Sequence, residues 1–410
     1  MVRSWENTAA AFLVLVLLVP LSFGCGAEKE GGKVTITIGE ITDLTGPASP
    51  AVITLHYALQ DMVKYYNEEG LIPGVKLDTA TWDDMFNPSR DMLGYDWVRE
   101  RGAKLIVSVF SASGVQLKAF ADRDKFPICN LSTNVAMTTP PGWVFCMSNG
   151  LGADMKTLLK WISENHWDYA KGIPKIGFEG GEDPGNREVA EAMQEYSQAH
   201  PDRFEYVGSC FYTIGQTLVV GGEAEKLRQC DYIASEGILT GPFIEEFQRR
   251  GYSTTFIDVG QLTNYRGLLV DRLGYKALDG LLTGNSSLGW NDNSPIVNLA
   301  KQLLNKYRHE QANAIIYKSL SYVGGTQNVA CILEILRNAI TQVGAQNFNS
   351  QAFYDAAVNY KTGGPLFEGY PQWSFSETKR YLVDQIVVSK FSAEANDVVR
   401  ISDWIPLVIE

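Results

Sequence analysis

The order of strand and helix patterns constrains the fold of this chain more than any other feature. Residues 34–38 alternate apolar and polar side chains, which is typical of a strand, and residues 51–66 carry apolar side chains at helical spacing. Residues 105–110 are apolar throughout, as expected of a strand covered on both faces. Further strands are predicted at 75–81 and 126–130. Alternating strands and helices of this kind predict a parallel sheet wrapped by helices.

The same alternation starts again in the second half of the chain. Four more strands are predicted, at 175–178, 206–211, 232–234 and 254–257, with helices between them, and these are followed by helices at 295–307, 328–341 and 350–360 and a strand at 381–390. A chain of 410 residues exceeds what one hydrophobic core usually serves. We therefore expect an α/β fold with two doubly wound parallel-sheet lobes. Because no low-complexity linker separates them, the junction is predicted to be a hinge.

Composition argues against several classes of protein. The net charge of −12 and the lack of a Lys/Arg cluster argue against nucleic-acid binding. The four histidines (His56, His166, His200 and His309) are far apart in the sequence, and none has the spacing of a metal site. No nucleophile elbow, Walker loop or dinucleotide-binding glycine motif is present. The sequence therefore predicts a protein that is not an enzyme and holds no metal or cofactor.

The first residues have the order of a secretory signal. Arg3 precedes an apolar run from Ala9 to Val19, and small residues lead to Gly24-Cys25. Gly24-Cys25 resembles the end of a bacterial lipobox, in which the cysteine is acylated and becomes the mature N-terminus. We expect residues 1–24 to be a signal peptide, Cys25 to carry lipid, and residues 25–33 to form a tether. Cleavage without lipidation is the alternative.

Five further cysteines follow Cys25: Cys129, Cys146, Cys210, Cys230 and Cys331. Secretion permits disulfides. Cys129 and Cys146 are the first pair to consider, because two consecutive predicted strands carry them. The alternative is that all five are small buried apolar residues with free thiols.

Three loops are candidates for a ligand site. Ligands of open α/β sheets bind beyond the carboxyl ends of the strands, where helix N-termini offer free backbone N–H groups. Residues 45–49, 111–114 and 131–134 meet these conditions and are rich in small hydroxyl side chains. Such a cluster suits a carboxylate or a neutral polar head such as an amide. The alternative is that the hydroxyl residues only cap helices.

Several segments together resemble a known family. The segments are Gly39 to Pro47, Asn67 to Gly74, Asp83-Asp84 with Asn87-Pro88, Ser111 to Gly114, Leu131 to Thr133 and Ser321 to Asn328. In this order they resemble the branched-chain amino acid type of ABC-transporter substrate-binding protein, which is leucine-binding-protein-like and belongs to the type I periplasmic binding proteins. The resemblance spans nearly the whole chain after the predicted tether.

The resemblance implies a Venus-flytrap architecture in which each lobe is discontinuous. Lobe 1 is expected to comprise residues 34–150 and about 275–345, and lobe 2 residues 151–274 and about 346–410. The implied function is extracytoplasmic solute capture, at the periplasmic or outer face of the membrane, and delivery to an ABC-transporter permease. A ligand-sensing module of a signalling system, which would use the same fold, is the alternative.

The resemblance also implies the residues that hold the ligand. In the family, two loops of lobe 1 hold the ligand carboxylate, and these correspond to Ala112 and Ser113, with Ser111 beside them, and to Ser132 and Thr133.

Lobe 2 departs from the family pattern. Pro184 stands where relatives carry an aromatic residue, and Gly260 stands where amino-acid binders keep an acid for the ligand ammonium. Glu236 or Asp258 could replace that acid, and solvated surface carboxylates are the alternative reading of both. The ligand is therefore expected to be an amino acid, an amide or another carboxylate.

Overall fold

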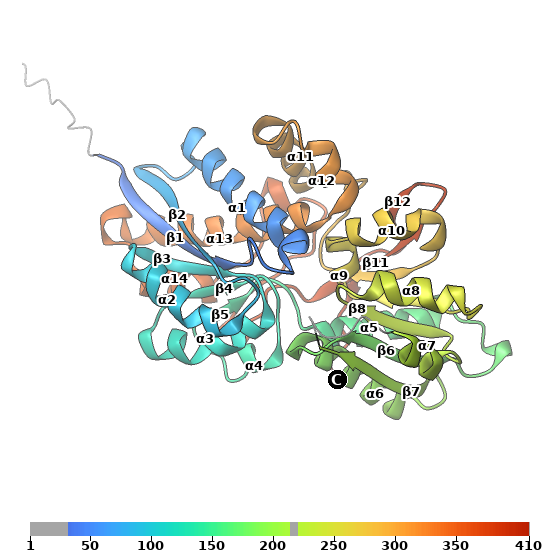
Figure 1. Cartoon of the computed structure of the whole chain (residues 1–410). Helices are drawn as coiled ribbons and strands as arrows, with labels where there is room; N and C mark the ends of the chain where they lie inside the picture. The colour runs from blue at the N-terminus through green and yellow to red at the C-terminus, as the bar shows by residue number, and fades with distance from the viewer. Residues whose placement is uncertain (1–31, 214–219, 410) are drawn as a thin grey trace, which may run out of the picture.

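The computed structural model describes residues 32–213 and 220–409, which form two lobes, each built on one sheet (Figure 1). The first sheet has five parallel strands in the order β2-β1-β3-β4-β5. Their bounds are β1 (Val34–Thr42), β2 (Val75–Asp83), β3 (Ala103–Ser108), β4 (Ile128–Asn130) and β5 (Val144–Cys146). β3 is buried on both faces, as its apolar sequence predicted.

The second sheet follows the order β12-β11-β10-β9-β8-β6-β7, and β13 pairs with β11. Its strands are β6 (Lys175–Gly181), β7 (Glu205–Tyr212), β8 (Tyr232–Glu236), β9 (Thr255–Asp258), β10 (Leu282–Asn285), β11 (Gln385–Ser392), β12 (Asp397–Arg400) and β13 (Ile405–Pro406). Strands β6 to β10 are parallel, whereas β11 runs antiparallel to β10 and β12. The predicted α/β class with two doubly wound sheets is confirmed.

Helices cover both faces of each sheet. In the first lobe they are α1 (Ser49–Glu68), α2 (Asp91–Glu100), α3 (Ser111–Asp124), α4 (Val135–Thr138), α11 (Pro295–Tyr307), α12 (Ala312–Lys318), α13 (Ser321–Val343) and α14 (Ser350–Val358). In the second lobe they are α5 (Leu151–Asn165), α6 (Pro184–Ala199), α7 (Gly221–Leu227), α8 (Thr240–Arg249), α9 (Gln261–Asn264) and α10 (Gly267–Ala277). Single 3₁₀ turns lie at Pro88–Arg90, Tyr169–Lys171, Ala345–Asn347 and Pro365–Phe367.

Alternation along each strand divides the core of each lobe in two. Ile38 of β1 faces the core under α1, α11, α13 and α14, whereas Ile41 faces the core under α2 and α3. In the second lobe Phe178 lies in the core under α5 and α6, and Ile233 in the core under α7, α8 and α10. Because successive side chains of a strand point to opposite faces, one short strand serves two cores.

The second and third crossings between the lobes lie later in the chain than the sequence predicted. β10 pairs with β9, so residues 275–285 belong to the second lobe. Phe353 of α14 and Trp373 pack in the core of the first lobe, so residues 346 to about 383 belong there. The crossings therefore fall near residues 148, 286 and 384. The four-residue β10 contains a glycine and is too short for its pattern to be recognised in the sequence.

The cysteines of the described residues are free, so Cys129 and Cys146, the first pair to consider, are not joined by a disulfide. The two lie on neighbouring strands, but Cys129 is opposite Phe145, so Cys146 is offset by one position. Cys129 consequently points into one core of the first lobe and Cys146 into the other. Burial raises the pKa of the Cys146 thiol to about 12, as expected of an inert packing residue.

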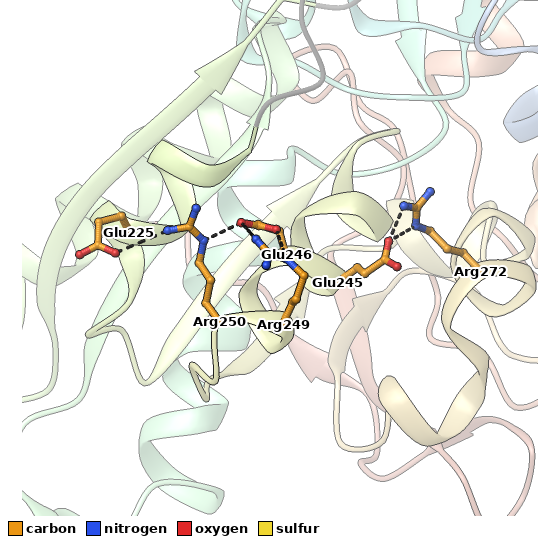
Figure 2. A network of polar contacts seen from close by, with 6 residues as sticks. All are labelled: Glu225, Glu245, Glu246, Arg249, Arg250 and Arg272. Atoms are coloured by element: carbon orange, nitrogen blue, oxygen red, sulfur yellow. Dashed lines mark hydrogen bonds and ion pairs between the residues drawn. The ribbon is translucent and has the colours of Figure 1, made fainter.

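The outer face of α8 carries a chain of charged side chains (Figure 2). The Glu246 carboxylate forms ion pairs with Arg249 Nε at 2.8 Å and Arg250 Nε at 2.6 Å. Glu245 pairs with Arg272 of α10. Hydrogen bonds from the two arginines lower the pKa of Glu246 to about 2. Exposed pairs of this kind contribute little to stability, and they mark the solvent face of the lobe. In the part of the chain that the structure describes, no helix is long and apolar enough to cross a membrane.

Candidate functional site

A cavity of about 290 Å³ lies between the two lobes. Its first-lobe wall is largely apolar and includes Val52 of α1, Phe86 and Phe110. Its second-lobe wall is largely polar and includes Asn186 and Gln261. The walls are formed by loops at the carboxyl ends of strands in both sheets, where parallel α/β folds place their ligands.

Three of the residues singled out in the sequence line this cavity: Ser111, Ala112 and Ser132. Ser111 begins α3, and the residue before it, Phe110, is extended and provides no side-chain cap. The first backbone N–H groups of α3 are therefore free to bind a polar group of a ligand. The Ser132 hydroxyl donates to Val109 O at 2.8 Å, which orders the loop at the edge of the cavity.

Ser113 and Thr133 lie behind this wall and not on it. Both are almost fully buried, at 3% and 2% exposure. The Thr133 hydroxyl lies 2.9 Å from both Ser148 O and Ser148 Oγ, and Ser148 does line the cavity. Thr133 thus orients a lining residue in this structure.

Glu236 and Asp258 are also buried away from the cavity wall. Glu236 Oε1 accepts from Val259 N at 3.0 Å. Asp258 accepts from Gly260 N at 2.9 Å, Leu262 N at 3.1 Å and Thr283 Oγ1 at 2.9 Å. Burial and the neighbouring Asp258 carboxylate raise the pKa of Glu236 well above its ordinary value. Two buried carboxyl groups this close disfavour the doubly ionised state.

The second-lobe wall is organised by a hydrogen-bond chain that the sequence did not reveal. Gln261 Nε2 donates to Asn186 Oδ1 at 3.0 Å, and Tyr265 OH donates to Gln261 Oε1 at 3.2 Å. Asn186 Nδ2 in turn donates to Gly181 O at 2.9 Å. The polar wall is therefore preorganised, because each side chain fixes the next.

Two carboxyl groups line the cavity, those of Asp154 and Asp183. Asp183 caps α6 by accepting from Gly185 N at 2.8 Å and Asn186 N at 3.0 Å through Oδ1. The Asp183-Pro184-Gly185 sequence, a capping residue followed by proline at the first helical position, is the signal that could have identified it.

A third group of acids, Asp43, Asp83 and Asp84, orders the loop beside the cavity. Asp83 accepts from Leu44 N at 2.9 Å and from Thr45 Oγ1 at 2.6 Å, and Asp84 accepts from Phe86 N at 2.8 Å. These bonds hold the turn that carries Phe86 into the cavity wall.

The lobes are in direct contact beside the cavity through Glu188 of α6. Its Oε2 accepts from Asn134 Nδ2 of the first lobe at 2.8 Å, and its Oε1 accepts from Gly152 N of the second lobe at 3.2 Å. A second contact is made by Arg266, which donates to Tyr317 O at 2.9 Å and pairs with Asp397. A cavity enclosed by two lobes that touch in this way defines a clamshell solute-binding protein.

The chain belongs to the periplasmic binding protein family, whose model matches residues 35–379. This confirms the leucine-binding-protein-like resemblance seen in the sequence. The family implies an extracytoplasmic location and a role in solute binding, and it is a family of binding proteins and not of enzymes. Among curated proteins, no sequence matches the chain.

Solved structures share the fold at low sequence identity. A branched-chain amino acid ABC transporter protein from Thermus thermophilus with bound valine has a TM-score of 0.78 and 17% identity, over 92% of this chain and 97% of that one. A fatty acid ABC transporter substrate-binding protein from Thermomonospora curvata has a TM-score of 0.76 and 13% identity, over 92% and 94%. A solute-binding protein from Rhodopseudomonas palustris BisB5 with 3,4-dihydroxybenzoic acid has a TM-score of 0.73 and 15% identity, over 91% and 97%.

Proposed function

We propose that this protein is an extracytoplasmic lipoprotein that captures a small polar ligand between its lobes and delivers it to the permease of an ABC transporter. The ligand is an amino acid, an amide or another carboxylate. The observation that carries the proposal is the cavity between the lobes, into which the uncapped N-terminus of α3 opens. The similar proteins named above bind valine and 3,4-dihydroxybenzoic acid, so one fold serves several small acids.

The ligand's polar head is proposed to lie against Ser111, Ala112 and Ser132. Ser113 and Thr133, which the family resemblance also indicated, would then support this subsite from behind, Thr133 through Ser148. Glu236 and Asp258 would hold the second-lobe wall in place from behind and would not touch the ligand. The chain works by binding and release in this proposal, and no side chain is assigned a catalytic role.

A thermal-shift screen of small metabolites tests this function. A ligand at 100 times its dissociation constant adds about 2.7 kcal/mol to the stability of the native state, which raises the melting temperature by several degrees. Stabilisation by a small acid, amide or amino acid is expected. If no compound in a broad library stabilises the protein, the proposed function is wrong.

The lipid anchor is tested separately, because Cys25 lies outside the residues that the structure describes. Cys25→Ser in the full-length chain is expected to release the protein from the membrane fraction or to block its processing. Cys331→Ser, at a buried free cysteine, serves as the control and should stay in the membrane fraction. Membrane association that is unchanged in Cys25→Ser would show that the protein is not anchored through this residue.

A further inference from the structure

The end of the chain contacts both lobes. Trp404 packs against the first-lobe core that lies under α1 and α13, whereas Ile405 and Val408 pack against the second-lobe core that lies under α5 and α6. Successive side chains of an extended segment point in opposite directions, so neighbouring residues can reach different lobes. Residues 404–408, which we call the C-terminal strap, therefore link the lobes in addition to the three chain crossings.

The backbone on both sides of Trp404 is fixed to the second lobe. On one side, Val388 N of β11 donates to Ser402 Oγ at 2.7 Å. On the other side, β13 pairs with the start of β11, directly after the third crossing, and Val408 N donates to Thr157 Oγ1 of α5 at 2.9 Å. The strap is therefore expected to move with the second lobe.

The Trp404 side chain, by contrast, is held by the first lobe. The centroid of its ring lies 5.2 Å from that of Tyr370 and 5.6 Å from that of Trp373. Its Nε1 donates to Gly369 O at 3.2 Å. Tyr370 OH in turn accepts from Leu288 N at 3.3 Å, close to the second crossing. Trp404 is thus a side chain of the second lobe that docks on the first.

This packing depends on how the lobes are oriented. The Trp404 ring and its partners belong to different lobes, so a rotation about the hinge moves them relative to one another. Trp373 is fully buried, and a close-packed interior tolerates such a displacement poorly. The same orientation allows Glu188 to accept from Asn134 beside the cavity. The strap and the Glu188 contact therefore favour the same arrangement, in which the lobes touch.

We infer that the C-terminal strap resists opening of the lobes, with Trp404 as its attachment to the first lobe. The family model ends at residue 379, so the strap lies beyond the part of the chain that the family match covers. The inference goes beyond the proposed function, because the strap acts on the protein before any ligand binds.

Small-angle scattering of the ligand-free protein tests the inference. Trp404→Ala removes both ring contacts and the hydrogen bond to Gly369. The ratio of open to closed molecules should rise by about five- to a hundred-fold, because these contacts stabilise the closed form alone. The radius of gyration is expected to increase accordingly. Trp404→Phe, which keeps an aromatic ring against Tyr370 and Trp373, should stay close to the wild type.

Trp167→Ala is the matched control. Trp167 is also half-buried, its Nε1 donates to Gly172 O at 2.8 Å, and its ring packs on the second-lobe core alone. Both alanine variants should lower the melting temperature, but only Trp404→Ala should increase the radius of gyration of the folded protein.

The inference is overturned if Trp404→Ala leaves the radius of gyration unchanged, or if Trp167→Ala increases it equally. Should Trp404→Ala fail to fold, Trp404→Leu, which retains part of the apolar contact, is subject to the same two outcomes. Because no ligand is added, failure of the strap leaves the proposed solute capture untouched.

Discussion

The acids inside the second lobe lower the stability of the fold when they ionise. Glu179 is fully buried, accepts from Ser235 Oγ at 2.7 Å through Oε2, and leaves Oε1 without a partner. Burial raises the pKa of Glu179 to about 8. A buried acid that ionises only at such a pH binds its proton more tightly in the folded than in the unfolded chain.

The stability of the fold therefore depends on pH through Glu179. Between the unfolded pKa of glutamate, about 4.3, and the folded pKa of Glu179, about 8, the folded state holds the extra proton, so stability falls as pH rises through this window. Glu179→Gln is expected to remove this loss. Its melting temperature should exceed that of the wild type by about 2–4 °C or more at pH 8.5 and match it near pH 5.

Glu205→Gln on neighbouring β7 is the control for this prediction, because Glu205 is exposed and makes only a 3.5 Å surface pair with Lys175. It should change the melting temperature by less than the Glu179 variant at every pH. Equal melting curves for Glu179→Gln and the wild type at pH 8.5 would show that ionisation of Glu179 does not lower the stability of the fold.

At the scale of elements, α6 joins the ligand wall to the contact between the lobes. Its first residues form the polar wall, and Glu188, one turn further along, bonds to Asn134 of the first lobe. Asn134 also donates to Pro184 O at 3.3 Å. Movement of the α6 terminus on ligand binding therefore acts directly on the contact that keeps the lobes together.

Glu188→Gln is expected to favour the open form. An amide in place of the carboxylate puts a donor opposite Asn134 Nδ2 or Gly152 N, and hydrogen bonds to charged groups contribute about 1.5–3 kcal/mol. The dissociation rate of whichever ligand the screen identifies should rise by about ten- to a hundred-fold, measured by stopped-flow fluorescence. Glu191→Gln, exposed on the same helix, should leave the rate unchanged. Equal rates for both variants would exclude a latch at Glu188.

The sequence predicted elements better than side-chain directions. Residues 34–38 lie in a strand as predicted, and the strand predicted at 105–110 is found at Ala103–Ser108. Ser111 and Ser132 line one cavity, because the carboxyl ends of parallel strands lie at the same edge of the sheet. Glu236 was predicted to follow its strand, yet it is the last residue of β8 and its side chain points into the lobe. The strand runs two residues further than predicted, so Glu236 is enclosed by the lobe and does not lie in the loop that follows.

At the scale of the whole molecule, the lobes are joined by three crossings and meet at the Glu188 and Arg266 contacts. Two rigid bodies connected in this way close by rotation about the hinge. Small-angle scattering with and without a saturating ligand should therefore show a smaller radius of gyration in the bound form. A radius of gyration that does not change would mean that capture proceeds without closure.

The late return of the chain to the first lobe has a consequence for biogenesis. β1 to β5 are made first, but the core beneath them is completed by α13, α14 and Trp373, after all of β6 to β10. Contacts between such distant segments form slowly, because the entropy of closing a long loop is lost before the contacts can stabilise the chain. A nascent chain of this topology cannot complete the core on the α1 side of its first sheet until nearly all of it has been synthesised. It would therefore stay loosely structured behind the ribosome, the state in which a translocation channel accepts a polypeptide.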